Sequence, residues 1–187
     1  MKKLLAFILT LAAVLSTVRV ETTAAALPEK LLRMHVLAAS DSEADQALKL
    51  RARDAVMAYL APLLADCQSR SEAERIAAEN LSAIAQIAAD ASGQRAAAGL
   101  VRENFTLREY EGFALPAGEY SALRIELEGG AGRNWWCVVF PPLCTALAEE
   151  DEDAFELLEE DEKALITGSG RIIKFRILEW LSFLRGI

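Results

Sequence analysis

The side chains with the greatest capacity for chemistry in this chain are its single histidine, His35, and its three cysteines, Cys67, Cys137 and Cys144. A cysteine beside a histidine can act as a thiolate nucleophile, and three cysteines with one histidine can bind zinc. The spacing favours neither site, because Cys67 is remote in sequence and the chain has no C-x-x-C pair. We therefore expect no catalytic residue, no metal and no cofactor, and we interpret His35 as a polar residue within a strand.

Cys137 and Cys144 could instead form a disulfide. They are seven residues apart with Pro141 and Pro142 between them, so the chain can turn back and bring the thiols together. The bond requires an oxidising compartment and a suitable Cα separation, which the sequence does not supply. Cys67 would then be left over, and it fits a small buried hydrophobic residue at the end of a helix.

These two cysteines belong to an unusual stretch, residues 134–144, with the sequence NWWCVVFPPLC. In a strand, successive tryptophans point to opposite faces, so one of them packs in the core and the other needs cover outside the sheet or meets a partner. The double proline ends the strand. We interpret the apolar side chains, supported by Asn134, as a rigid ridge for partner binding; the ridge consists of Trp135, Trp136, Phe140, Pro141 and Pro142.

Helical periodicity dominates the first half of the chain. Residues 32–38 form a short apolar run that predicts a buried strand, and a capping cluster follows it. Apolar residues then recur at helical spacing over residues 43–65, with Lys49 outside the apolar stripe. A second helix is predicted from a capping box formed by Ser71 and Glu74 to the residue before Gly93.

Strand patterns follow from about residue 100. Residues 105–107 and 123–127 alternate apolar and polar side chains, and the glycine-rich residues 129–132 predict a hairpin that pairs the second of these runs with the tryptophan strand. We therefore predict an α+β fold. Two N-terminal amphipathic helices pack on a small, mostly antiparallel sheet, and an acidic linker and a C-terminal amphipathic helix follow.

The N-terminus has the pattern of an export signal. Lys2 and Lys3 precede an apolar run over residues 4–18, and alanines at 24–26 supply an A-x-A cleavage site. The run is short for a spanning helix, which needs about 20 residues. An uncleaved anchor is the alternative, and in either case we expect the residues from about Leu27 onward to lie outside the membrane of the cell that makes them.

The formal charge of −8 is concentrated in one place. Residues 149–162 contain ten carboxylates, and without them 18 acidic residues face 20 basic ones. The chain has no basic stripe, so we expect no nucleic-acid partner, and we interpret the acidic block as a solvated linker. The predicted divisions are a signal peptide at 1–26, an α+β domain at 27–147, the linker at 148–168 and a C-terminal segment at 169–187.

The C-terminal segment alternates basic and apolar residues in a pattern that fits an amphipathic helix, with a strand at its start as the alternative. Such a helix packs on the domain or lies on a membrane surface.

Several short motifs occur in a fixed order with plausible gaps. They are LRMHV at 32–36, SDS at 40–42, DQALK at 45–49, RDAV at 53–56, LPAGEY at 115–120 and NWWCVVFPPLC at 134–144. Over residues 32–144, and again near 174–181, they resemble the stage II sporulation protein R family. The chain departs from the family pattern at Ala39, where asparagine is expected, and at residues 110–112, where a tighter Tyr-Gly is expected.

The resemblance implies a protein that is not an enzyme but an intercellular signal of endospore-forming bacteria. It implies export from the forespore into the space between forespore and mother cell. There the signal is needed to trigger a membrane-embedded aspartic protease of the mother cell, which removes the pro-sequence of an early mother-cell sigma factor. The family offers no agreed catalytic residues to carry across.

We add His35, Asp41 and Arg53 to the candidate partner-binding residues, because the first strand and helix could flank the ridge. Buried polar groups satisfied within the fold are the alternative for all three. Two other classes of function stay open at this point. One is a secreted cysteine-dependent hydrolase, and the other is a membrane- or wall-surface binding module that acts through residues 172–187.

Overall fold

The computed structural model describes residues 2–146 and 155–185, and it divides into two compact units. The larger unit is built from Pro28–Asn104 and Glu119–Leu157, and the smaller one from Met1–Leu27, Phe105–Gly118 and Leu158–Ile187. The predicted α+β class is confirmed. The expected domain at residues 27–147 is divided differently, because the segment around residues 105–118 belongs to the smaller unit.

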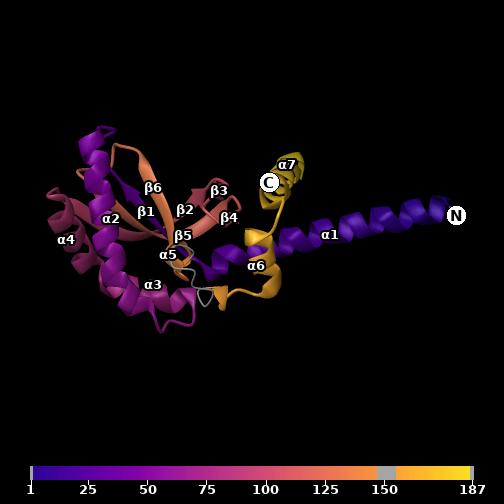
Figure 1. Ribbon diagram of the computed structural model, residues 1–187, viewed down its shortest axis with the longest axis horizontal. Helices are drawn as coiled ribbons and strands as arrows, with labels where there is room; N and C mark the ends of the chain where they lie inside the picture. The colour runs from indigo at the N-terminus through magenta and orange to yellow at the C-terminus, as the bar shows by residue number, and fades with distance from the viewer. Residues whose placement is uncertain (1, 147–154, 186–187) are drawn as a thin grey trace. The chain divides into compact units, whose positions relative to one another are not determined.

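The larger unit contains a mixed four-stranded sheet in the order β2, β5, β1, β6 (Figure 1). The strands are β1 (Leu32–Leu37), β2 (Ala96–Phe105), β5 (Gly118–Leu127) and β6 (Asn134–Phe140). β1 pairs in parallel with β5 and antiparallel with β6. The predicted hairpin between β5 and β6 is therefore wrong, since β1 lies between them.

The loop from β5 to β6 crosses the end of β1 instead of turning tightly. The Gly132 N–H donates to the Ala38 carbonyl at 2.8 Å, just past the end of β1. A Cβ added at Gly132 would lie 2.2 Å from the carbonyl oxygen of Ser40, so only glycine permits this approach. The glycine-rich stretch predicts a tight turn, but in the fold its glycine at 132 allows the loop to pass close to the backbone of Ala38 and Ser40.

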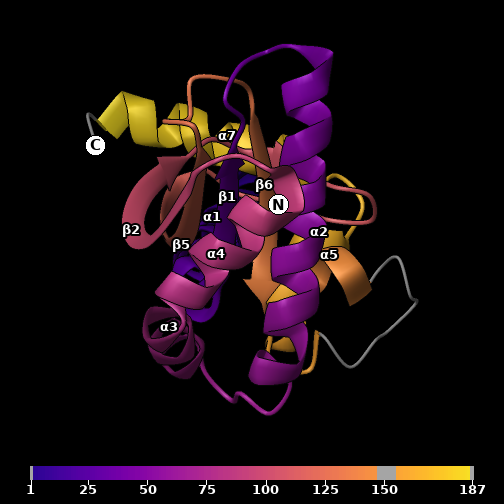
Figure 2. The same ribbon diagram turned by 90° about the vertical axis from the view of Figure 1, so that its left-hand side faces the viewer.

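Three helices accompany this sheet: α2 (Glu43–Leu64), α3 (Arg70–Glu79) and α4 (Leu81–Ser92). Figures 1 and 2 show α2 and α4 against one face of the sheet. Apolar side chains of these helices join those of the strands in one core, because each helix buries one stripe and each strand one face. The helical members of that core include Ala52, Val56, Leu60, Ala77, Ile84 and Ala88.

The second predicted helix is in fact two helices, α3 and α4, separated at Asn80. The Asn80 side chain donates to the Ile76 carbonyl at 2.8 Å and accepts from the Tyr59 hydroxyl at 2.6 Å. These bonds give the chain an alternative to the helical ladder at that point. The cap of α3 also lies two residues earlier than predicted, since Ser69, not Ser71, accepts from the Glu72 N–H.

The smaller unit contains most of α1 (Lys2–Lys30), the two-stranded antiparallel sheet of β3 (Arg108–Glu109) and β4 (Ala114–Leu115), α6 (Glu160–Thr167) and α7 (Arg171–Arg185). A short helix, α5 (Leu143–Ala146), follows β6 in the larger unit. Among the described residues, no helix combines the length and the apolar character needed to cross a membrane.

The segment expected to be a solvated linker, residues 148–168, is partly helical. Its first residues, up to 154, lie outside the described residues, but α6 begins with a capping box in which the Glu162 side chain accepts from the Glu159 N–H. Leu165 and Ile166 are buried. Acidic side chains at the start of α6 favour helix formation there, because they complement the positive end of the helix dipole.

The predicted C-terminal amphipathic helix is confirmed as α7. Phe175 is buried, whereas the opposite side of α7 exposes large apolar side chains. Their exposed fractions range from 49% at Ile177 to 78% at Phe183.

Candidate functional site

The two faces of the mixed sheet have different chemistry. On β1, Leu32, Met34 and Val36 belong to the core beneath the helices, so Arg33 and His35 lie on the other face. In the pairing of β1 with β6, Val36 is opposite Trp135 and His35 is opposite Trp136. The two tryptophans therefore lie on opposite faces, as the strand alternation predicted.

The face away from the helices carries a group that we call the His35 face, consisting of His35, Glu103, Arg124, Glu126 and Trp136. The imidazole of His35 stacks on the Trp136 ring with 3.8 Å between centroids and 20° between planes. Its Nδ1 lies 3.0 Å from Glu103 Oε1. Because His35 is only 4% exposed, these contacts fix the imidazole in place beneath the half-buried tryptophan.

Charged side chains of β5 lie on the same face, on the other side of His35 from Trp136. Arg124 pairs with Glu126 at 2.6 Å, and about a third of each of these side chains remains exposed (37% and 33%). Also on this face of β1, the fully buried guanidinium of Arg33 lies 4.9 Å from the centroid of the Tyr120 ring. An aromatic surface flanked by charges of both signs suits recognition of another polypeptide, by aromatic contact and charge-assisted hydrogen bonds.

Trp135 occupies a different environment on the helix side of the sheet. The Arg53 guanidinium of α2 lies 4.7 Å from the centroid of its ring, and Arg53 also pairs with Asp54 at 2.6 Å. Lys49, expected outside the apolar stripe, is buried and donates to Gln46 Oε1 at 2.6 Å and to the Arg133 carbonyl at 3.0 Å. Burial, followed by the positive charge of Arg133, lowers the pKa of Lys49.

Asp41 contacts neither tryptophan. Its carboxylate accepts from the Arg133 N–H at 2.6 Å and pairs with the Arg133 guanidinium at 3.5 Å. These bonds tie the loop before β6 to the segment after β1. The structure therefore brings His35 to Trp136, Arg53 to Trp135, and Asp41 to neither.

The apolar ridge predicted from NWWCVVFPPLC is not a continuous exposed surface. Phe140 is 3% exposed and Pro141 is buried, while Asn134 and Pro142 are exposed. Phe140 belongs to the core cluster, because a bulge near the β1 pairing of Leu32 shifts the end of β6. The candidate residues are therefore distributed between the core and two faces of the sheet.

Cys137 and Cys144 are free thiols that lie close together. Cys137 is fully buried on the core face, Cys144 is half-buried, and the Val138 N–H donates to Cys144 Sγ at 3.2 Å. Because Cys137 is on the opposite face from His35, the two do not form a nucleophilic pair. Cys67 is buried at the end of α2, as predicted, and burial raises the pKa of its thiol.

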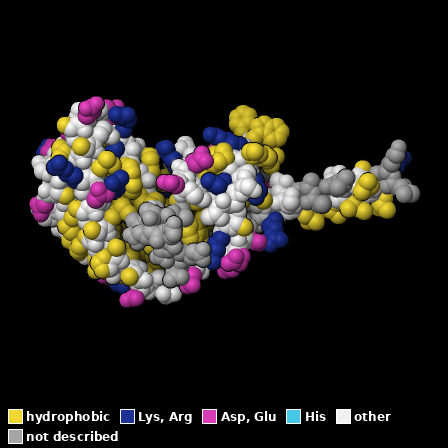
Figure 3. Space-filling model, viewed as in Figure 1, with side chains coloured by type: hydrophobic (Ala, Val, Ile, Leu, Met, Phe, Trp, Pro, Cys, Tyr) yellow, Lys and Arg dark blue, Asp and Glu magenta, His cyan; other side chains and the backbone are white. Residues whose placement is uncertain are grey.

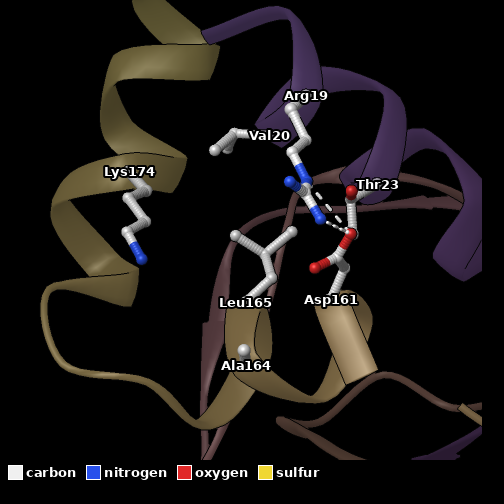
Figure 4. A pocket seen from close by; sticks show the side chains of 7 residues that line it. All are labelled: Arg19, Val20, Thr23, Asp161, Ala164, Leu165 and Lys174. Carbon is white, nitrogen blue, oxygen red and sulfur yellow. Dashed lines mark hydrogen bonds and ion pairs between the residues drawn. The ribbon is translucent and has the colours of Figure 1, made fainter. Parts of the chain in front are cut away.

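Two further observations concern ligand binding. The described part of the chain contains no group of three or more His, Cys, Asp or Glu side chains able to hold a metal ion. In the smaller unit, a pocket of 150 Å³ lies between α1, α6 and α7 (Figure 4). Its polar side is closed by an ion pair of Arg19 with Asp161, and its volume is below the roughly 300 Å³ of small ligand sites. The lining residues are Arg19, Val20, Thr23, Asp161, Ala164, Leu165 and Lys174.

Sequence reasoning missed three members of the His35 face. The alternation over residues 123–127 predicts that Arg124 and Glu126 lie on the solvent face of a strand. It does not predict that β1 and His35 lie beside them, because the predicted hairpin put the tryptophan strand in that place. Glu103 carried no signal, since the alanine-rich start of β2 does not resemble a strand.

Comparison with known proteins identifies relatives of this fold. The family described as Stage II sporulation protein R matches residues 28–150. Stage II sporulation protein R of Bacillus subtilis (strain 168) is 33% identical over 183 residues, which cover 83% of this chain and 82% of the relative. No solved structure matches the chain. These matches support a role in sporulation, and the chain belongs to the stage II sporulation protein R family.

Proposed function

We propose that this chain is an exported, non-enzymatic sporulation signal. It is made in the forespore and crosses into the space between forespore and mother cell. There it activates the membrane-embedded aspartic protease of the mother cell that processes an early sigma-factor precursor. We further propose that the His35 face contacts the protease.

One observation carries the proposal. The family match spans residues 28–150, which include every strand of the mixed sheet and therefore the whole His35 face. The helices α6 and α7 lie outside the matched residues. The resemblance of the strand motifs supports the signalling role, and the partly exposed Trp136, Arg124 and Glu126 side chains of the face support a protein partner.

The signal must act through differential binding. A ligand activates a protease only if it binds the active arrangement more tightly than the idle one. Trp136 is held rigidly on His35, so little side-chain entropy is lost when a partner covers it. An anchoring tryptophan of this kind contributes ~2 kcal/mol or more to binding.

The test is co-expression of the full chain, the candidate protease and the sigma-factor precursor in a host that does not sporulate, with precursor cleavage read on an immunoblot. Cleavage should require the chain. A variant with Ile8→Arg and Leu11→Arg, which interrupts the apolar run, should block export and cleavage together. Cleavage by this variant without export would contradict action outside the membrane.

The same assay maps the contact. Trp136→Ala should reduce activation by about 30-fold, the equivalent of ~2 kcal/mol. Arg124→Glu should also reduce activation, because it reverses a charge on the His35 face. Trp135→Ala, the matched control on the opposite face, should retain activation. Full activation by folded Trp136→Ala and Arg124→Glu variants would remove the His35 face from the interface.

A second candidate function, contact with a membrane surface, is supported by α7. Its exposed apolar side chains recur at helical spacing, and the helix carries four basic residues and one acidic residue. Figure 3 shows hydrophobic side chains at α7 and along α1. An amphipathic helix with aromatic and basic residues binds the interface of anionic lipids. The exposed apolar residues of α7 are Ile173, Ile177, Trp180, Phe183 and Leu184.

Flotation of the full chain with phosphatidylglycerol or phosphatidylcholine vesicles tests this contact. Replacing Ile177 and Trp180 with serine should lower binding to the anionic vesicles, because it removes apolar area that would enter the interface. Leu50→Ser is the control, since Leu50 is an exposed leucine of α2 (38%). Equal binding by the double variant and the control would exclude α7 as a lipid contact.

A further inference from the structure

The neighbouring thiols of Cys137 and Cys144 have no part in the proposed signalling contact. Cys137 lies near the middle of β6 and Cys144 lies in α5. The chain reverses between them through Pro141 and Pro142, and both sulfurs then contact the backbone of Val138: Cys137 Sγ lies 3.5 Å from its carbonyl oxygen and Cys144 Sγ lies 3.2 Å from its nitrogen. Two thiols that share one backbone neighbour are close enough for a disulfide between them to be considered.

The two thiols are not equivalent. Cys137 is fully buried among core side chains, and its thiol donates to the Val138 carbonyl oxygen at 3.5 Å. Cys144 is half-buried, and its Sγ accepts a hydrogen bond from the Val138 N–H at 3.2 Å. Donors directed at a sulfur stabilise its thiolate form.

The pKa values follow from these contacts. The hydrogen bond from the Cys137 thiol, with help from the Val138 N–H, lowers the pKa of Cys144, and burial raises the pKa of Cys137. Cys144 therefore has the greater thiolate fraction near neutral pH, and it is also the more accessible of the two sulfurs. Both properties are those of the attacking thiol in thiol–disulfide exchange.

We propose that Cys144 and Cys137 form a dithiol–disulfide site that reacts with a disulfide-bearing oxidant, either a small molecule or a protein. The Cys144 thiolate attacks one sulfur of the oxidant, forms a mixed disulfide and releases the first thiolate. Cys137 then loses its proton and attacks Cys144 Sγ, which closes the intramolecular bond and releases the second thiolate. The pair loses two electrons and two protons, and the oxidant becomes two thiols.

The closed bond would join β6 covalently to α5. It would hold the edge strand at its centre, at the residue that directly follows Trp135 and Trp136. In an oxidising compartment the disulfide would therefore join β6 to α5, and in a reducing compartment the two cysteines would remain thiols.

The experiment uses the full chain with Cys67→Ser, so that only this pair reports. The protein is incubated in glutathione buffers of increasing oxidised fraction, alkylated and mapped by mass spectrometry. We expect a peptide linked through Cys137 and Cys144, with the loss of two hydrogen atoms from the intact mass. Absence of the link in the folded chain, under buffers in which the urea-unfolded chain forms it, would overturn the proposal.

Single variants test the order of attack. With Cys137→Ser, glutathione should accumulate on Cys144 as a mixed disulfide, whereas with Cys144→Ser it should leave Cys137 unmodified. Because a serine in the core could disturb folding, limiting iodoacetamide is also applied to the Cys67→Ser chain itself. Cys144 should be alkylated about tenfold faster than Cys137 or more. Faster modification of Cys137 by either reagent would overturn the assigned roles.

Discussion

Gly132 lies where the strand order of this fold requires two backbone segments to pass close together. The loop from β5 to β6 must cross the end of β1, and it does so with its backbone against the carbonyl of Ser40. No side chain fits between these two backbone segments. A sequence pattern reports that glycine is present, but it does not report whether a turn or a close approach needs it.

We predict that Gly132→Ala destabilises the protein by about 1–3 kcal/mol, because the added methyl overlaps a backbone carbonyl that cannot move freely. The change is measured as the shift of the urea midpoint of unfolding. Gly99→Ala is the matched control, since a Cβ there meets nothing within 4 Å. Its effect should stay within about 0.5 kcal/mol. Equal stability of the two variants would show that the loop can move away from Ser40.

The sequence predicted only part of the arrangement that stacks His35 on Trp136. Strand alternation correctly separated Trp135 from Trp136. It could not say which strand lies beside β6, and so it could not place His35 under Trp136. Asp41 and Arg53 were named as candidates for the same surface, yet they lie at a loop and at the opposite tryptophan, because their partners come from segments distant in sequence.

At the scale of elements, the helical segments were the easiest to predict and their ends the hardest. The periodicity of α2 and α7 located both helices from local sequence alone. The separation of α3 from α4 depends on the contact of Asn80 with Tyr59, twenty-one residues earlier in the chain. No local pattern contains that partner.

The cap of α3 provides a direct test. Ser69→Ala should destabilise the protein by about 1 kcal/mol, because the Glu72 N–H loses its acceptor. Ser71→Ala, at the position that the sequence favoured as the cap, should change stability by less than about 0.5 kcal/mol. Both are read from urea midpoints. A greater loss from Ser71→Ala than from Ser69→Ala would reassign the cap.

For the molecule as a whole, acid sensitivity should arise partly from carboxylates that the fold holds ionised. Hydrogen bonds from Ser40 and Gln94 lower the pKa of Asp45, and hydrogen bonds from Arg95 lower that of Glu128. A lowered folded pKa contributes stability above the unfolded value of about 4, and this contribution is lost as the pH falls through the folded pKa.

We therefore expect the urea midpoint to fall as the pH is lowered below about 4. Asp45→Asn should make this fall shallower, because the variant removes one of the two groups that take up protons on unfolding. Glu128→Gln should do the same independently, since the two carboxylates have different partners. A pH profile unchanged in both variants would assign the acid sensitivity to other groups.

The sequence by itself determined the α+β class, the main amphipathic helices, the opposite orientation of the two tryptophans and the family. These features depend on neighbouring residues, whose spacing the chain displays directly. Only the tertiary structure decided the strand order, the burial of Phe140, the pairing of His35 with Trp136 and Glu103, and the proximity of Cys137 to Cys144. Each of these depends on which distant segments share a face, and that choice is made by packing the whole core at once.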